Sequence, residues 1–168
     1  MKDEKRQWQA RETRMVAEYI QLNYKEYPYR MRVRLGSISN VLSGRYQNLE
    51  EERMAGSWRR WADAVIFKPD QIVIIEASIR ADPGDISRLK LYKLLFPHTP
   101  EMQPYASLPI TLELVYAMLD EVIVQLARQE GIKVVEYKPP WLNDYLSILY
   151  PRERRVTPVN ITDLGKQR

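Results

Sequence analysis

The sequence contains no cysteine and a single histidine, His98, among its 168 residues. Without cysteine it cannot form disulfides, thiolate zinc sites, iron–sulfur clusters or a cysteine nucleophile. One histidine cannot form a two-histidine metal site, and a Ser-His-Asp triad would depend on it alone. His98 has no evident partner acid and is assigned no role. These absences exclude most hydrolase and metalloenzyme templates.

Long hydrophobic runs are absent too, since none approaches the ~20 residues of a membrane helix. Residues 2–6 are all charged and no apolar stretch follows them, unlike in a signal peptide. We therefore expect a cytosolic protein with no membrane partner. Lys and Arg number 26 against 22 Asp and Glu, giving a formal charge of +4. That excess favours contact with polyanions such as DNA.

The composition is that of a folded protein, with 45% hydrophobic and 29% charged residues. The length suits one domain, which we place at residues 1–150. Residues 151–168 turn to Arg, Thr, Pro, Asn and Lys with few apolar side chains. We expect an extended or mobile C-terminal tail there.

Hydrophobic periodicity and turn residues divide the domain into alternating elements. Helices are predicted over residues 3–24, 83–96, 120–129 and 141–149, and strands over 29–38, 58–67, 71–79, 110–118 and 132–137. Residues 36–56 are predicted to form a long loop with a short helix near 49–54. The order predicts an α/β fold with a mixed central β-sheet flanked by helices on both faces.

Two acids occupy notable places in the hairpin formed by the second and third strands. Its turn is centred between Pro69 and Asp70, so Asp63 and Glu76 are expected to lie nearly opposite each other. Two carboxylates inside an apolar sheet repel, and burial disfavours both charges. A divalent cation such as Mg²⁺ between them would relieve this, because it binds one or two carboxylates plus waters and phosphate oxygens.

A purely structural role for both acids remains open at this point. Asp63 could pair with Arg59, Arg60 or Arg80, and Glu76 could mark the exposed end of its strand. Ion pairs of this kind also place acids in sheets.

The segments 61–67 and 73–78 resemble the hairpin of the PD-(D/E)XK nuclease superfamily. The resemblance covers roughly residues 1–139 and implies a restriction-endonuclease-like αβββαβαβ core. It also implies that Asp63 and Glu76 are catalytic ligands of Mg²⁺ or Mn²⁺. Ser78 stands where the family motif ends in a lysine, and Ala62 stands where it has a proline.

A serine hydroxyl cannot supply the charge of that lysine. Two functions from different classes therefore follow from the resemblance. The first is a nuclease-like protein that has lost or weakened cleavage and serves as a DNA-associated or structural assembly component, for example in a phage head–tail neck, and so in a virion. The second is an active Mg²⁺-dependent DNA endonuclease.

A substitute cation is available on the helix that follows the hairpin. Arg88 and Lys90 are both candidate catalytic cations, but they lie about 200° apart around a helix and cannot both point inward. Arg88 is preferred, because it shares a face with Tyr92 at i, i+4 and the resemblance implies that this helix presents such side chains to the site. Both cations could instead be solvated charges.

Further charged residues could serve binding or assembly. Arg30, Arg32 and Arg34 are predicted to share one strand face, with Arg59 and Arg60 nearby and Trp58 and Trp61 interleaved. Such a cluster suits either DNA phosphates or a protein interface, including a homo-oligomer. On the first helix, Glu12, Glu18 and Glu26 are candidates for the extra acid that the resemblance implies, although a solvated charged face would also explain them.

Overall fold

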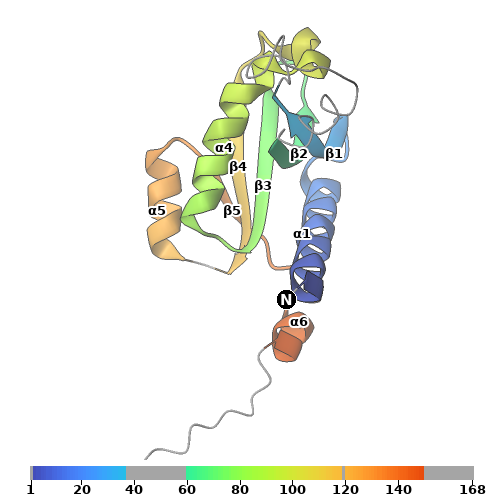
Figure 1. The fold of residues 1–168 in the computed structure, drawn as a ribbon, viewed down its shortest axis with the longest axis vertical. Coiled ribbons are helices and arrows are strands. Elements are labelled where there is room, and N and C mark those ends of the chain that lie inside the picture. The colour runs from blue at the N-terminus through green and yellow to red at the C-terminus, as the bar shows by residue number, and fades with distance from the viewer. Residues whose placement is uncertain (1, 37–59, 119, 150–168) are drawn as a thin grey trace, which may run out of the picture.

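The computed structural model of the protein describes residues 2–36, 60–118 and 120–149 (Figure 1). Within them the elements are α1 (Lys2–Asn23), β1 (Tyr29–Leu35), β2 (Arg60–Phe67), β3 (Ile72–Arg80), α4 (Pro83–Leu95), β4 (Ile110–Met118), α5 (Glu121–Gln129), β5 (Lys133–Glu136) and α6 (Leu142–Leu149). Within the described ranges, the order from α1 to β5 is the αβββαβαβ order that was predicted.

Two short 3₁₀ helices, Phe96–His98 and Pro100–Tyr105, follow α4 and were not predicted. Most of the predicted loop over 36–56 and the predicted tail over 151–168 lie outside the described residues. None of the helices in the described ranges is long and apolar enough to cross a membrane.

The five strands form one mixed sheet in the order β1-β2-β3-β4-β5. The first two pairings are antiparallel and the last two are parallel. The β3-α4-β4 and β4-α5-β5 crossovers proceed in the same direction across the sheet, and the right-handed rule therefore puts α4 and α5 on the same face. The predicted α/β class with a mixed sheet flanked by helices is confirmed.

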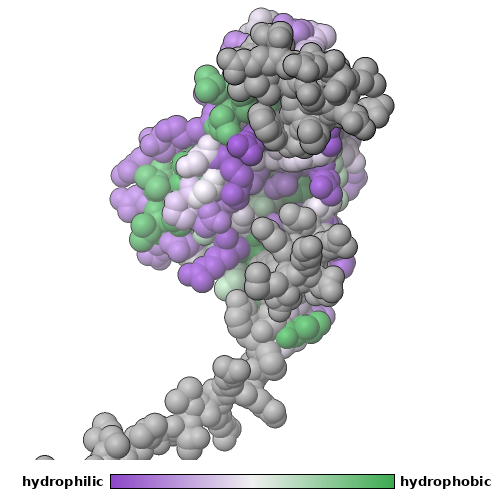
Figure 2. Space-filling model, in the orientation of Figure 1, coloured by the Kyte–Doolittle hydropathy of each residue, from purple (hydrophilic) through white to green (hydrophobic). Residues whose placement is uncertain are grey.

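Each face of the sheet has its own hydrophobic core. One core lies against α4 and α5 and includes Leu89, Phe96 and Val124. The other lies against α1 and α6 and includes Val16 and Ile20. The central strand β3 contributes to both cores, which explains the unbroken apolar run at its start. On the outer surface, hydrophobic residues are visible over α5 in Figure 2.

The β1–β2 ribbon changes faces halfway along. Met31 packs in the α1 core whereas Val33 packs in the α4 core, although residues two apart in a regular strand point the same way. On β2 the same change occurs between Ala62 and Ala64. Arg32 lies at the break with a φ of 51°, a left-handed conformation that bends the strand.

This break separates the arginines of β1. Arg30 pairs in register with Val65 and lies over the Phe67 ring, on the α4 side. Arg34 pairs with Trp61, next to the inward-facing Ala62, and so points to the other side. The prediction that Arg30, Arg32 and Arg34 share one strand face is therefore wrong, because strict alternation fails at the bend.

A buried carboxylate fixes α1 to the sheet. Glu113 on β4 is fully buried and accepts hydrogen bonds from the hydroxyls of Tyr19 (2.5 Å) and Tyr24 (2.8 Å). The ammonium of Lys133 on β5 lies 2.7 Å from the same carboxylate. A buried charge is tolerated only when it is paired and hydrogen-bonded, so these contacts set the position of α1.

Tyr19→Phe is expected to lower the free energy of unfolding by about 1.5–3 kcal/mol, because it removes one hydrogen bond to a buried charge. Urea denaturation measures this. Tyr29→Phe is the matched control, since within the described ranges its hydroxyl has a hydrogen bond only with the exposed Gln21, and it is expected to stay within about 0.5 kcal/mol of wild type. Equal stability of the two variants would contradict the proposed role of Glu113 as an anchor.

Candidate functional site

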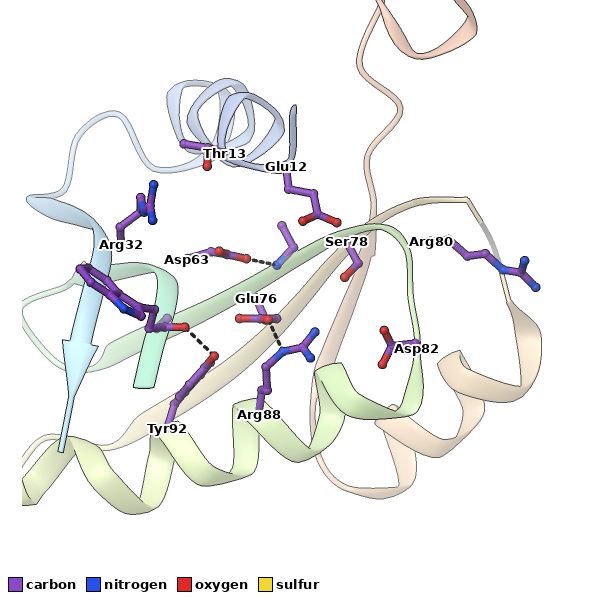
Figure 3. Close-up of a pocket in the computed structure, with 13 residues that line it drawn as sticks. Glu12, Thr13, Arg32, Asp63, Glu76, Ser78, Arg80, Asp82, Arg88 and Tyr92 are labelled. Atoms are coloured by element: carbon purple, nitrogen blue, oxygen red, sulfur yellow. Dashed lines mark hydrogen bonds and ion pairs between the residues drawn. The ribbon is translucent and has the colours of Figure 1, made fainter. Parts of the chain in front are cut away.

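A polar pocket of about 440 Å³ lies where α1, the bend of the β1–β2 ribbon, the end of β3 and the start of α4 meet (Figure 3). It exists because β2 stops pairing with β3 beyond Ala64 and Ile75 and leaves the last part of β3 uncovered. Its charged lining residues are Glu12, Arg32, Asp63, Glu76, Arg80, Asp82 and Arg88.

Asp63 and Glu76 converge in this pocket, as predicted from the hairpin turn. Ala64 and Ile75 are register partners, and Asp63 and Glu76 are the next residues on the two strands. The Asp63 carboxylate accepts a hydrogen bond of 2.9 Å from the Ala77 amide, which β2 no longer satisfies with its backbone. The carboxylate thus holds the two strands together where their ladder ends.

Glu76 is not at an exposed strand end, since only 6% of its surface is accessible. Its Oε1 accepts a hydrogen bond from Arg88 Nε at 2.5 Å, while its buried Oε2 has no hydrogen-bond partner among the described residues. Burial, together with the charge of Asp63, raises the pKa of Glu76 to about 8, although Arg88 opposes the shift. Glu76 Oε2 can therefore bind a proton or a cation.

The pKa values of two further carboxyl groups of the pocket, Asp63 and Glu12, are also raised. Burial raises the pKa of Asp63, and the Ala77 amide and Arg88 oppose that shift. Burial and the neighbouring Asp63 raise the pKa of Glu12, on α1, to about 7. In Figure 3 Glu12 reaches down from the helix toward the strand that carries Ser78 and Glu76. The pKa values of Glu12 and Glu76 thus both lie near neutral pH.

Arg88 is held by acids on both sides. Besides Glu76, its guanidinium contacts Asp85, which is fully buried one turn earlier on α4. Asp85 also accepts hydrogen bonds from Ser78 Oγ at 3.0 Å and from the Asp82 amide at 2.8 Å. The last contact is half of a capping box that begins α4. The Asp85 side chain thus both caps α4 and positions the Arg88 guanidinium.

Gly84 supplies the space that this arrangement needs. A Cβ at residue 84 would lie 2.7 Å from an Asp82 carboxylate oxygen and 3.2 Å from an Arg88 guanidinium nitrogen. Any larger residue would therefore push against both the helix cap and the cation. The missing side chain of Gly84 thus leaves room for Arg88 over the first turn of α4.

Of the other residues predicted for the site, some line the pocket and others lie outside it. Arg88 and Tyr92 both line the pocket, as the i, i+4 spacing indicated. Lys90 points away and pairs with Glu130 at 2.6 Å, so its assignment as a catalytic cation is wrong, since 200° of helix rotation separates it from Arg88. Arg60 is exposed at the start of β2 outside the pocket lining, and Arg59 lies outside the described residues.

Sequence reasoning gave no preference to Glu12 and missed Asp85. Glu12 lies three, four and seven residues before Met15, Val16 and Tyr19, so it is the acid on the buried stripe of α1, and this spacing was a usable signal. Glu18 instead accepts a hydrogen bond from Trp141 at 3.0 Å. For Asp85 the signal was its third position in a capping box.

The donor chemistry of the pocket suits a hard divalent cation. Asp63 and Glu76 offer carboxylate oxygens, and Glu76 Oε2 has no hydrogen-bond partner in the described part of the chain. No three His, Cys, Asp or Glu side chains of the described ranges are grouped as a ready ligand shell. Mg²⁺ fits such a site, because it is commonly bound by one or two carboxylates and keeps several waters.

Stability without metal is expected to fall as the pH rises from about 5 to 9, because unfolded Glu76 ionises near 4.5 whereas the folded protein keeps the proton up to about 8. Glu76→Gln cannot ionise and should reduce this fall by at least about 1 kcal/mol. Urea denaturation in EDTA across this range measures it. Glu26→Gln, at an exposed position, should keep the wild-type slope. An unchanged slope in Glu76→Gln would contradict the raised pKa.

No protein-family model matches the chain, and neither does any curated protein sequence. Solved structures do resemble it. A repair endonuclease from Pyrococcus abyssi has a TM-score of 0.45 and 21% identity over 75% of this chain and 46% of its own. EndoMS in a complex with double-stranded DNA has a TM-score of 0.45 and 19% identity over 75% and 44%.

A third structure, of a protein from Vibrio cholerae, has a TM-score of 0.43 and 16% identity over 83% of this chain and 32% of its own. The chain thus spans less than half the length of each of these proteins. At such distances the matches assign no activity to it.

Proposed function

We propose that this chain is a nuclease-like protein that hydrolyses phosphodiester bonds of DNA with a divalent cation. The observation that carries the proposal is the convergence of Glu12, Asp63 and Glu76, from three different elements, beside the guanidinium of Arg88. Carboxylates with raised pKa values grouped around one cation in a pocket are typical of a reactive site.

Asp63 and Glu76 would hold Mg²⁺ or Mn²⁺, which when bound polarises a phosphoryl oxygen and lowers the pKa of a bound water. The residues of the chain supply the rest. Glu12, with a pKa of about 7, is suited to accept a proton from the attacking water near neutral pH. A cation held by Glu76 would replace its contact with Arg88 and would satisfy its buried Oε2.

Arg88 takes the place of the lysine with which the family motif ends and which this chain replaces with Ser78. If a cation took its place on Glu76, the guanidinium would remain anchored through Asp85 and could donate to the phosphate as charge develops there. Arg32 and Arg80 lie at opposite ends of the pocket in Figure 3, and neither has a carboxylate partner among the described residues. Both are available to bind the flanking phosphates.

A second candidate is a protein that binds DNA in the same pocket without cleaving it. One observation favours it: the guanidinium of Arg88 already contacts the carboxylates of both Glu76 and Asp85, and Ser78 has no charge to add. No feature of the described residues points to a particular protein partner, and none supports a role in phage head–tail assembly.

Plasmid nicking with Mg²⁺ or Mn²⁺ distinguishes the two candidates. We expect cation-dependent cleavage that falls at least about 100-fold in Asp63→Ala and in Glu76→Gln, and about 100- to 1,000-fold in Arg88→Ala, the loss typical of removing one donor to a developing charge. Lys90→Ala is the matched control and is expected to remain within twofold of wild type.

Cleavage that persists in the Asp63→Ala/Glu76→Gln double variant would show that the activity lies elsewhere or in a contaminant. Absence of cleavage with either metal, combined with DNA binding that weakens in Arg32→Ala, would favour the second candidate.

A further inference from the structure

Trp61 is an exposed aromatic residue at the edge of the pocket. Its neighbours Ala62, Ala64 and Val65 are fully buried, yet 43% of Trp61 is accessible to solvent. The side chain also belongs to the lining of the pocket that contains Asp63. Trp61 is thus an aromatic side chain exposed beside a polar pocket, on a strand whose residues from Ala62 onward are mostly buried.

Two cations flank the indole. The guanidinium carbon of Arg34 lies 4.4 Å from the ring centroid and that of Arg32 lies 5.5 Å from it. Guanidinium groups at these distances form cation–π contacts. They place planar, positively charged groups against the indole, and both bases and phosphates of nucleic acids bind such groups.

The main chain under the indole is fixed. The Tyr92 hydroxyl of α4 donates a 2.5 Å hydrogen bond to the Trp61 carbonyl (dashed line from Tyr92 in Figure 3). Trp61 precedes Asp63 by two residues, which is about 7 Å along a strand. That corresponds to about two nucleotide steps of roughly 3.4 Å in a stacked nucleic-acid strand. A base next to a phosphate in the pocket can therefore reach the indole.

We propose that Trp61, supported by Arg32 and Arg34, stacks on a nucleobase adjacent to the phosphate bound in the pocket, so that the preferred substrate is single-stranded or has an unpaired nucleotide there. This inference rests on the proposed function for the identity of the ligand and adds its substrate class. Paired bases in an intact duplex have both faces covered by their neighbours and offer no free face to the indole. Unpaired bases of any sequence do, because every base has a π-face.

The test measures binding rather than cleavage. Fluorescence anisotropy in EDTA compares fluorescein-labelled octathymidylate with an abasic chain that has the same eight phosphates, for wild type and Trp61→Ala. We expect Trp61→Ala to bind octathymidylate about 5- to 150-fold more weakly, the range implied by loss of one base–aromatic stack. The substitution should change affinity for the abasic chain less than twofold.

Two further variants control for folding and for general aromatic effects. Trp61→Tyr keeps a stacking ring and is expected to recover most of the affinity. Tyr29→Ala removes another exposed aromatic side chain of the same ribbon, outside this pocket, and is expected to bind as wild type. Equal losses for octathymidylate and the abasic chain, or no loss in Trp61→Ala, would overturn the inference.

The outcomes separate this inference from the proposed function. A loss of affinity in Trp61→Ala that appears only with the base-containing chain, in a protein that shows no cleavage, would support the stacking surface and reject catalysis. Cleavage that depends on Asp63, together with a Trp61→Ala variant that binds both chains as wild type does, would support catalysis and reject the stacking surface.

Discussion

The hydrogen bond from the Ala77 amide to the Asp63 carboxylate is the contact on which the site depends. Where β2 turns away from β3, the backbone amide of Ala77 loses its strand partner, and the Asp63 side chain replaces it. A buried amide left without a partner is costly, so this contact both ends the ladder and fixes an acid at the opening. The pocket is the space that the bend of the β1–β2 ribbon leaves between α1 and α4.

The electrostatics of the pocket follow from that placement. Burial raises the pKa of Asp63, Glu76 and Glu12 together, and Arg88 compensates them only in part, since it also contacts Asp85. An additional cation relieves this imbalance. Mg²⁺ held by Asp63 and Glu76 would take its remaining ligands from phosphate oxygens and water.

The sheet and the two strand acids could be predicted from sequence because they depend on local signals. Alternation, the apolar run of β3 and the Pro69-Asp70 turn determine which residues face each other, and Asp63 and Glu76 followed from that register. The placement of Glu12 depended on how α1 docks through Glu113, which is a tertiary contact. The bend at Arg32 has no residue signature, since a positive φ is unusual for arginine, and the shared face predicted for the arginines of β1 failed there.

Anomalous diffraction from crystals grown with Mn²⁺ tests the central claim most directly, because it locates the ion without reference to activity. The account predicts one strong anomalous peak within about 2.5 Å of carboxylate oxygens of both Asp63 and Glu76, with the Arg88 guanidinium no longer on Glu76. Saturating Mn²⁺ that leaves this pocket without a peak while the Glu76–Arg88 ion pair stays intact would contradict it.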